Sequence, residues 1–340
     1  MRYTLFGPSG LRVSELCLGT MTFGTEWGWG ADYDTSKAIF DVYADAGGNF
    51  IDTANRYTEG TSERFVGEFI ASDRDHFVLA TKYTLHDKRD DISYSGNSRK
   101  NMIRSLEHSL KRMNTDYIDL FWVHMWDFTT PPEEILRGLD DLVSSGKILY
   151  IGISDTPAWR VSQMNTMAEL RGWTSFAGLQ IEYSLLQRTP ERDLIPMAKA
   201  FDLAITPWGA IGGGALTGKY LKGEEGRVKE ESARRSDRAN TIAQAVVDVA
   251  EELGVTPAQV AIKWTMRQGV QSIPIVGARK TNQLEDSLKA TEIEIPEEQL
   301  RKLNEVSAIE LGFPHDFLSN ENVMDVVHGG VYEKIKGWRK

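Results

Sequence analysis

Residues 49–63, NFIDTANRYTEGTSE, carry an acid and a phenol between an apolar run and the start of a helical pattern. Asp52 ends the apolar run, Tyr57 follows on the next loop, and two further apolar runs end at Lys82 and His124. A tyrosine has a reference pKa of about 10, and a neighbouring ammonium group lowers that pKa because it favours the phenolate. Together, these residue types suit proton transfer to a carbonyl oxygen.

Each of the four residues has its own expected role. Lys82 makes the Tyr57 phenol a better acid, Asp52 holds and compensates the buried ammonium, and His124 donates a hydrogen bond to the reacting oxygen. The alternative is that Asp52 and Lys82 form an ordinary ion pair at a barrel rim, with His124 as a core histidine. The chemistry therefore depends on elements that bring all four side chains together.

The elements alternate along the chain between short apolar runs, typical of strands, and longer segments with helical periodicity. The expected strands span 16–20, 49–52, 77–82, 118–124, 148–154, 176–182, 203–208 and 271–274. The expected helices include 36–46, 62–71, 97–112, 132–145, 157–171, 191–201 and 240–268, the last broken near Gly254. This rhythm predicts a (β/α)8 TIM barrel, with an open doubly wound sheet as the alternative.

Features outside the repeats complete the predicted architecture. The residues around 7–10 predict an N-terminal β-hairpin that plugs the barrel floor. The long loops 84–96 and 209–238 follow strands, and such loops gather at the catalytic C-terminal face of a barrel. We expect one domain over residues 1–340, with the barrel at about 16–308 and a C-terminal tail at 309–340.

Composition narrows the class of protein. A net charge of −10 and a pI near 5.2 argue against nucleic acid or an anionic membrane as the main partner. No apolar run approaches the roughly 20 residues that span a bilayer. Cys17 is the single cysteine, the first residues lack the apolar core of a signal peptide, and the six histidines lack metal-ligand spacing. We therefore expect a cytoplasmic protein without a metal site.

Several motifs occur in a fixed order around the four residues: ERFVGEF, ATKY, LQIEYSLLQR, TPWGAIGGGALTGKY and IPIVGARKTNQLEDS. With these motifs, residues 16 to about 307 resemble the aldo-keto reductase family, and IGISDTPAW and GTMTFGTEWGWG resemble a bacterial branch of it. The resemblance implies a (β/α)8 barrel that reduces an aldehyde or ketone to the alcohol. Hydride comes from NADPH, and Tyr57 is the general acid.

The resemblance also implies where the cofactor binds. It assigns Ser154 and Gln180 to the nicotinamide carboxamide, Trp208 to stacking on the nicotinamide ring, and residues 209–213 to the pyrophosphate. The full set of implied cofactor-binding residues is Thr20, Ser154, Asp155, Gln180, Trp208, Gly209, Ala210, Ile211, Gly213, Lys219, Gly277, Arg279, Gln283 and Asp286. Of these, Lys219 approaches the phosphates, Arg279 and Gln283 the adenosine ribose or its 2′-phosphate, and Asp286 the adenine.

The basic pair Arg279 and Lys280 favours NADPH over NADH because a 2′-phosphate needs a cationic partner. Two positions depart from the family pattern. Asp155 stands where the family commonly has Asn, and Asp286-Ser287 stands where a Glu-Asn pair is expected.

Aromatic residues after the first, third and fourth expected strands suggest the substrate class. If they form a wall over the nicotinamide, the substrate is apolar or aromatic. The alternative is plain packing beneath the loops. These residues are Trp27, Trp29, Tyr83, Trp126 and Phe128.

Two other functions have partial support in the sequence. Residues 213–219 approximate a P-loop, but Tyr220 follows where that motif needs Ser or Thr for magnesium. The same barrel family also includes cofactor-binding beta subunits of potassium channels, which resemble this chain in GKY and around Gln283. Those subunits tend to carry Asn at the position of His124, so His124 favours the enzyme.

Overall fold

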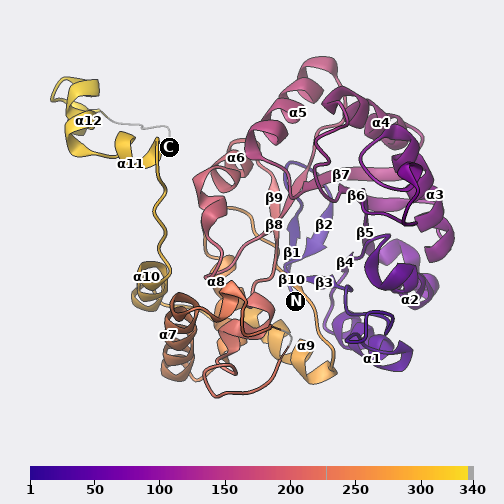
Figure 1. The fold of residues 1–340 in the computed structure, drawn as a ribbon, viewed down its shortest axis with the longest axis horizontal. Coiled ribbons are helices and arrows are strands. Elements are labelled where there is room, and N and C mark those ends of the chain that lie inside the picture. The colour runs from indigo at the N-terminus through magenta and orange to yellow at the C-terminus, as the bar shows by residue number, and fades with distance from the viewer. Residues whose placement is uncertain (227, 336–340) are drawn as a thin grey trace.

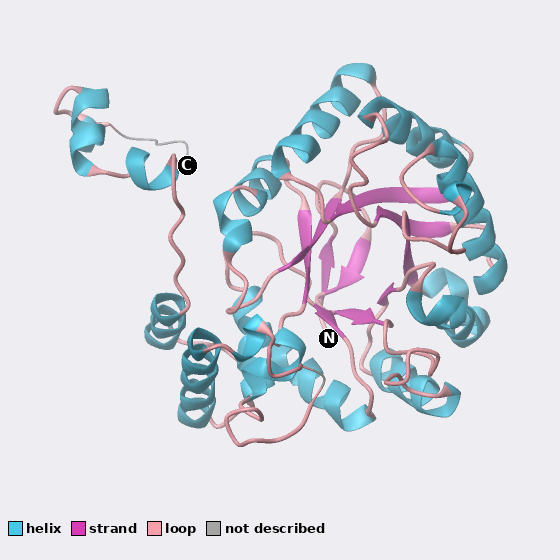
Figure 2. Ribbon diagram, in the orientation of Figure 1, coloured by secondary structure: helices cyan, strands magenta, loops and turns pink. Residues whose placement is uncertain are grey.

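The computed structural model describes residues 1–226 and 228–335 of the 340-residue protein, so Arg227 in the expected 209–238 loop and residues 336–340 of the expected tail lie outside it. A parallel sheet in the order β10-β3-β4-β5-β6-β7-β8-β9 lies inside a ring of helices, as Figure 2 shows. Its strands are β3 Cys17–Gly19, β4 Phe50–Asp52, β5 Val78–Tyr83, β6 Ile118–Val123, β7 Ile148–Ser154, β8 Gly178–Glu182, β9 Ala204–Trp208 and β10 Ile275–Val276. The prediction of a (β/α)8 barrel is confirmed.

The helices around this sheet are α1 Tyr33–Asp45, α2 Thr61–Ile70, α3 Arg99–Met113, α4 Pro132–Ser144, α5 Ala158–Arg171, α6 Leu194–Ala200, α7 Asp237–Leu253, α8 Pro257–Thr265 and α9 Thr281–Leu288 (Figure 1). The later helices, α10 Glu297–Val306, α11 His315–Leu318 and α12 Glu321–His328, lie outside this ring. The expected break near Gly254 separates α7 from α8, where Gly254 adopts a φ of 65° as the C-cap of α7.

The last strand lies later than the sequence suggested. Residues 271–273 pair with β9 through Ile205, whose N–H donates to Gln271 O at 2.9 Å and whose carbonyl accepts from Ile273 N at 2.9 Å. Pro274 interrupts this pairing because it has no N–H, and β10 then pairs with β3. The predicted strand 271–274 thus pairs with β9 and β10 pairs with β3, and together the two segments close the ring of strands.

A hairpin closes the barrel floor, as predicted. Strands β1 Tyr3–Leu5 and β2 Arg12–Ser14 pair antiparallel, and the following Phe6 is fully buried. Its ring makes edge contacts with Phe50 at 5.6 Å and Trp122 at 6.2 Å between ring centroids. Gly178 provides the space, since a Cβ there would overlap the Phe6 ring.

Alternation along each strand decides which side chains reach the barrel interior. On β5, Val78 and Ala80 pack in the interior cluster with Phe6 and Trp122, whereas Leu79 and Tyr83 pack in the cluster between sheet and helices. Lys82 shares the face of Ala80. The β5 carboxyl end therefore sends its ammonium group inward and its neighbouring phenol outward.

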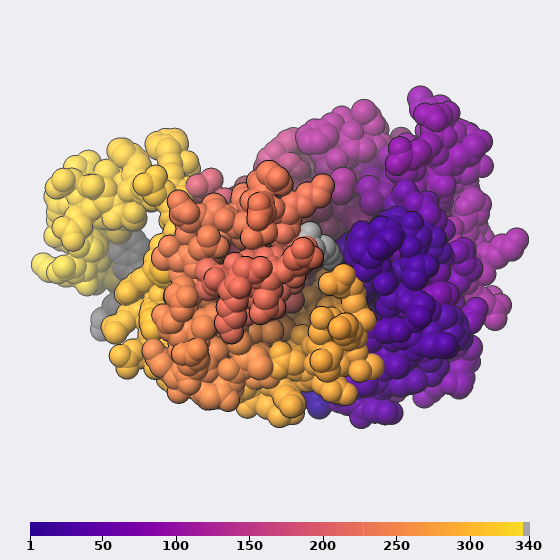
Figure 3. Space-filling model, turned by 60° about the horizontal axis from the view of Figure 1, so that its bottom comes forward, coloured from indigo at the N-terminus to yellow at the C-terminus, as the bar shows by residue number. Residues whose placement is uncertain are grey.

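The C-terminal residues leave the barrel after α10, and α11 and α12 lie to one side of it (Figures 1 and 3). Arg192 holds the start of this segment through a hydrogen bond from Nη2 to Glu310 O at 2.8 Å. Several apolar side chains beyond that point are exposed, among them Phe313, Phe317 and Val326. No helix in the described part of the chain is both long and apolar enough to cross a membrane.

Candidate active site

Four side chains converge at the carboxyl ends of the first barrel strands. Asp52 ends β4, Lys82 lies near the end of β5, His124 follows β6, and Tyr57 begins the 3-10 turn Tyr57–Gly60 after β4. Lys82 Nζ pairs with Asp52 Oδ2 and donates to Tyr57 OH at 3.1 Å. The Tyr57 and His124 rings meet edge to face with centroids 6.1 Å apart. The structure thus brings all four predicted catalytic residues together.

The Lys82–Asp52 pair is buried, with side-chain exposures of 0% and 3%. Burial is the largest influence and lowers the pKa of Lys82, but the charges and hydrogen bonds of Asp52 and Tyr57 together outweigh burial and leave that pKa above its ordinary value. Lys82 also donates to Thr53 O at 2.8 Å, and Gln180 Nε2 donates to Asp52 Oδ1 at 3.1 Å. The ammonium group is therefore charged and fixed in position.

The pKa values of Tyr57 and His124 are shifted in opposite directions. Burial raises the pKa of Tyr57, and the Lys82 ammonium acts in the opposite direction, as expected, without cancelling the effect of burial. Burial, with the Lys82 charge, holds the pKa of His124 well below its ordinary value. At neutral pH the site thus presents a protonated phenol beside a neutral imidazole.

The strand ends opposite carry the residues predicted to hold the nicotinamide. Ser154 is buried at the end of β7, and Trp208 is partly exposed at the end of β9. The Trp208 side chain donates a hydrogen bond to the Asp155 carboxylate, which opposes the rise that burial causes in the Asp155 pKa. Asp155 has a φ of 38°, so this departure from the family pattern coincides with a left-handed backbone residue.

A glycine loop follows Trp208 and turns through left-handed residues. Gly209, Gly212, Gly213 and Gly214 all have positive φ, from 60° to 95°. Lys219 lies against this loop, because a Cβ on Gly214 would be 2.9 Å from Lys219 Nζ. Left-handed glycines let backbone amides approach an anion closely, and a lysine adds charge there. The loop, with Ala210 and Ile211, has the form expected of a phosphate cradle.

The predicted adenosine end is exposed and basic. Gly277, Arg279 and Gln283 are all exposed, and Gln283 Oε1 accepts from Arg279 N at 3.0 Å at the start of α9. Asp286 instead accepts from Thr256 Oγ1 at 2.9 Å and Gln259 Nε2 at 2.7 Å, between α9 and α8. Both Asp286 oxygens therefore have partners within the protein, and its contact with adenine stays a prediction.

Two other predicted cofactor residues are engaged within the protein. The Thr20 hydroxyl donates to Asp52 O at 3.0 Å and accepts from Ser62 Oγ at 2.8 Å. Gln180 donates to Asp52, as described above. In this structure both side chains fix the catalytic cluster, and their contacts with the cofactor also stay predictions.

Tyr83 does not lie at the mouth as the sequence suggested. It has no exposed surface and stacks on Phe121 with ring centroids 5.2 Å apart, in the layer between sheet and helices. The physical reason is the alternation of β5: Lys82 points inward, so the next residue points outward. The assignment of Tyr83 to the substrate wall is wrong.

The other four aromatic residues lie on the loops. The Trp27 ring approaches the Tyr57 ring edge to face at 6.4 Å and the Trp29 ring at 5.8 Å. Trp126 is buried, with its ring centroid 6.5 Å from that of Phe128, which is 81% exposed. Trp27 is therefore the ring beside the acid, and Phe128 extends into solvent.

The sequence comparisons agree with this geometry. The sequence model of the aldo/keto reductase family matches residues 15–308. The chain belongs to the aldo/keto reductase family. As an aldo/keto reductase it is an oxidoreductase of a class that uses nicotinamide cofactors.

Similar proteins come from fungi. Norsolorinic acid reductase of Aspergillus flavus is 37% identical over 92% of this chain and 83% of its own length. Aryl-alcohol dehydrogenase (NADP(+)) of Phanerodontia chrysosporium is 38% identical over 96% of this chain and 91% of its own. Aldo-keto reductase ausK of Aspergillus calidoustus is 35% identical over 93% and 85%.

The residues present fit a nicotinamide dinucleotide. Trp208 offers an aromatic face, the glycine loop with Lys219 suits a pyrophosphate, and Arg279 lies exposed near the start of α9. His124 Nδ1 is buried and has no hydrogen-bond partner among the described residues, so one polar atom at the centre of the site remains available. Within the same described residues, no cluster of His, Cys, Asp or Glu could hold a metal ion.

Sequence reasoning missed two residues of this aldo/keto reductase site. Arg56 and Glu59 flank Tyr57 and form an ion pair, and Glu59 accepts a hydrogen bond from Trp27 Nε1 at 3.3 Å. Their spacing of three residues was the available signal, but it equally describes any surface pair.

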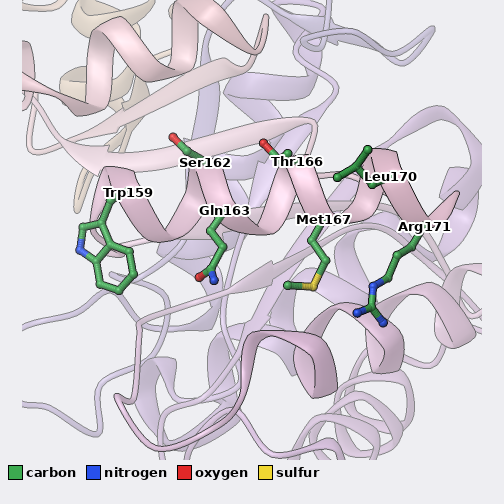
Figure 4. Close-up of a pocket in the computed structure, with 7 residues that line it drawn as sticks. All are labelled: Trp159, Ser162, Gln163, Thr166, Met167, Leu170 and Arg171. Carbon is green, nitrogen blue, oxygen red and sulfur yellow. The ribbon is translucent and has the colours of Figure 1, made fainter.

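A shallow hollow elsewhere on the surface is separate from this site. Figure 4 shows its lining side chains along one side of α5, including Trp159, Met167 and Leu170. None of its lining residues belongs to the predicted site, and α5 is in the outer helix layer. The hollow therefore has no part in the chemistry at the strand ends.

Proposed function

We propose that this aldo/keto reductase uses NADPH to reduce an apolar or aromatic aldehyde or ketone to the alcohol. The observation that carries the proposal is the hydrogen bond from Lys82 to Tyr57 OH, made while Asp52 holds Lys82 and His124 flanks Tyr57. An ordinary rim ion pair does not require a phenol and a neutral imidazole in the same cluster.

The residues divide the work of reduction. Bound NADPH supplies the hydride that the carbonyl carbon accepts. Tyr57 donates its proton to the carbonyl oxygen, and Lys82 stabilises the resulting phenolate by charge and hydrogen bond. Neutral His124 donates a hydrogen bond to the same oxygen and orients it. Solvent then returns the proton to Tyr57.

NADPH is proposed over NADH because Arg279 and Lys280 lie exposed before α9 and can meet a 2′-phosphate. The name of the aryl-alcohol dehydrogenase relative specifies NADP(+) and supports this choice. Replacement of Arg279 by Ala should weaken NADPH binding and leave NADH binding nearly unchanged, which isothermal titration calorimetry can measure.

An aromatic substrate is proposed because the Trp27 ring borders Tyr57. The name of the same relative, an aryl-alcohol dehydrogenase, agrees with this class. Three further expectations stay predictions: a cytoplasmic location, a single domain over residues 1–340 and membership of a bacterial branch. The relatives given above are fungal.

The proposal is tested by measuring NADPH oxidation by the purified protein with para-nitrobenzaldehyde, beside NADH. We expect turnover that prefers NADPH. Tight NADPH binding without turnover of any aromatic or aliphatic aldehyde would instead favour the cofactor-binding regulatory module.

A further inference from the structure

The loop between β3 and α1 is tied to the turn that carries Tyr57. Thr58 Oγ1 donates to Phe23 O at 2.5 Å, Thr61 Oγ1 donates to Glu26, and Trp27 Nε1 donates to Glu59. At its other side, the same loop reaches the predicted cofactor segment, since Thr22 Oγ1 donates to Ala278 O at 2.7 Å. The loop is thus fixed between the proton donor and the adenosine end.

Three side chains form the contact nearest to Tyr57, and we name them the Trp27 clamp: Arg56, Glu59 and Trp27. One Glu59 oxygen, Oε1, accepts from Trp27 Nε1 at 3.3 Å, and the other, Oε2, pairs with Arg56. The Arg56 guanidinium carbon lies 5.9 Å from the Trp27 ring centroid. Each member therefore contacts both others, which restricts the ring to one orientation.

The turn brings Glu59 into contact with Trp27 through an unfavourable backbone conformation. Thr58 and Glu59 are consecutive left-handed residues, with φ of 45° and 56°, and neither is glycine. Such conformations are unfavourable, most of all for a β-branched residue, and persist only where neighbouring contacts hold them. Thr58 Oγ1 supplies such contacts because it also accepts from Ser62 N at 3.2 Å. Strain immediately after the proton donor indicates a positional role.

The clamp contributes little to folding. Glu59 has a side-chain exposure of 53%, and an ion pair with one partner this exposed stabilises a protein only weakly. The hydrogen bonds from Arg56 and Trp27 hold the pKa of Glu59 below its ordinary value, so the carboxylate is ionised at neutral pH. The main effect of the Arg56–Glu59 pair is therefore to hold the Trp27 ring in position.

We infer that Glu59 and Arg56 are positioning residues that hold the Trp27 ring beside Tyr57 and thereby set the preference for aromatic over small aliphatic carbonyl substrates. This inference rests on the proposed function. An aromatic ring of the substrate would pack on the indole face while its carbonyl oxygen meets Tyr57 OH. A small aliphatic aldehyde has too little surface to use that face.

The test is a double-mutant cycle of Glu59→Ala and Trp27→Phe, with kcat and KM measured for para-nitrobenzaldehyde and for propanal. We expect Glu59→Ala to lower kcat/KM for the aromatic aldehyde on the order of tenfold, mainly through KM, and to affect propanal far less. In the Trp27→Phe background, Glu59→Ala should have no further effect. Glu59→Gln, which keeps an acceptor for the indole N–H, should recover part of the loss.

A matched control removes another exposed ion pair. Glu107 on α3 pairs with Lys147 just before the amino end of β7, opposite the carboxyl ends that carry the site, with exposures of 48% and 42%. Glu107→Ala should therefore leave the reduction of both aldehydes unaffected. Equal losses for both aldehydes in Glu59→Ala, or an undiminished loss in the Trp27→Phe background, would overturn the inference.

Failure of the proposed function would look different. A parent enzyme that binds NADPH but reduces neither aldehyde would contradict the function itself. The clamp is then still tested by crystal structures of the parent and of Glu59→Ala. We expect the Trp27 ring to lose its single orientation in the variant, and an unchanged ring would contradict the clamp.

Discussion

Lys82 is the residue through which the site acts, because it joins the acid Tyr57 to the carboxylate that holds its charge. Its surroundings keep the ammonium charged despite complete burial. Loss of the Asp52 carboxylate would leave a buried charge without a partner, and the hydrogen bond from Gln180 fixes that carboxylate in place. At the residue scale, the cluster is a series of contacts: Gln180 fixes Asp52, and Asp52 pairs with Lys82. Lys82 in turn donates to Tyr57.

The protonation states predict how rate depends on pH. Reduction needs the Tyr57 phenol and oxidation needs its phenolate, and burial holds the pKa of Tyr57 above its ordinary value of 10.0. The phenol is populated below its pKa, so the reduction rate should stay flat through neutral pH and fall only at strongly alkaline pH. The rate of alcohol oxidation should rise with pH below the pKa of Tyr57, as the phenolate becomes more populated, by up to about tenfold per pH unit. Rate profiles in both directions test this, and a reduction rate that halves near neutral pH would contradict it.

The sequence was sufficient to find the four catalytic candidates, because each follows a recognisable apolar run. It was not sufficient for the hydrogen bond from Gln180 to Asp52, since this bond joins residues 128 positions apart in different strands. Tyr83 was expected at the barrel mouth, which is wrong. The sequence held the signal for its true position, since alternation along the strand makes the residue after Lys82 point outward. Glu59 could not be assigned because its orientation depends on a left-handed backbone that the sequence does not reveal.

At the scale of elements, glycines in the strands make room for the rings that fill the barrel. Gly178 on β8 faces Phe6 from the hairpin, and Gly152 on β7 faces Trp122 on β6. The strand positions followed from apolar runs, but the closing segment did not, because Pro274 divides one run between two neighbouring strands. Local patterns predict which residues form strands, whereas pairing across the closure depends on the whole ring.

Gly178→Ala should therefore destabilise the protein. The added Cβ overlaps the Phe6 ring, which is fully buried and cannot move away, so we expect a loss of about 1–3 kcal/mol in the free energy of unfolding. Gly10→Ala is the control, because nothing lies within 4 Å of a Cβ there. Urea denaturation of both variants measures the difference, and equal midpoints would show that Phe6 does not plug the floor as described.

At the scale of the whole molecule, a barrel and a C-terminal segment differ in how they are held. The family match ends at residue 308, and Arg192 contacts Glu310 just beyond it. Farther on, α11 and α12 lie beside the barrel, away from the strand ends (Figure 1). The sequence marked residues from 309 as a tail, but the placement of that tail could not follow from a pattern without repeats.

Removal of residues 312–340 should leave the barrel and its chemistry intact. The truncation keeps Glu310 and its bonds to Arg192, and α11 and α12 supply no residue of the catalytic cluster. We expect kcat to change less than about twofold and the melting temperature to shift by only a few degrees. Steady-state kinetics and calorimetry check this, and a loss of turnover would place the tail in the site.

The most direct test of the proposed mechanism compares two tyrosines that lie close to Lys82 but face opposite ways. Tyr57→Phe removes the proposed acid, and Tyr83→Phe removes a hydroxyl without a hydrogen-bond partner among the described residues. Single-turnover NADPH oxidation with para-nitrobenzaldehyde should slow by about 10²–10⁴-fold in Tyr57→Phe, with NADPH binding retained, because a positioned general acid contributes about that much. Tyr83→Phe should match the parent. A Tyr57→Phe variant as fast as the parent would contradict the proposed mechanism.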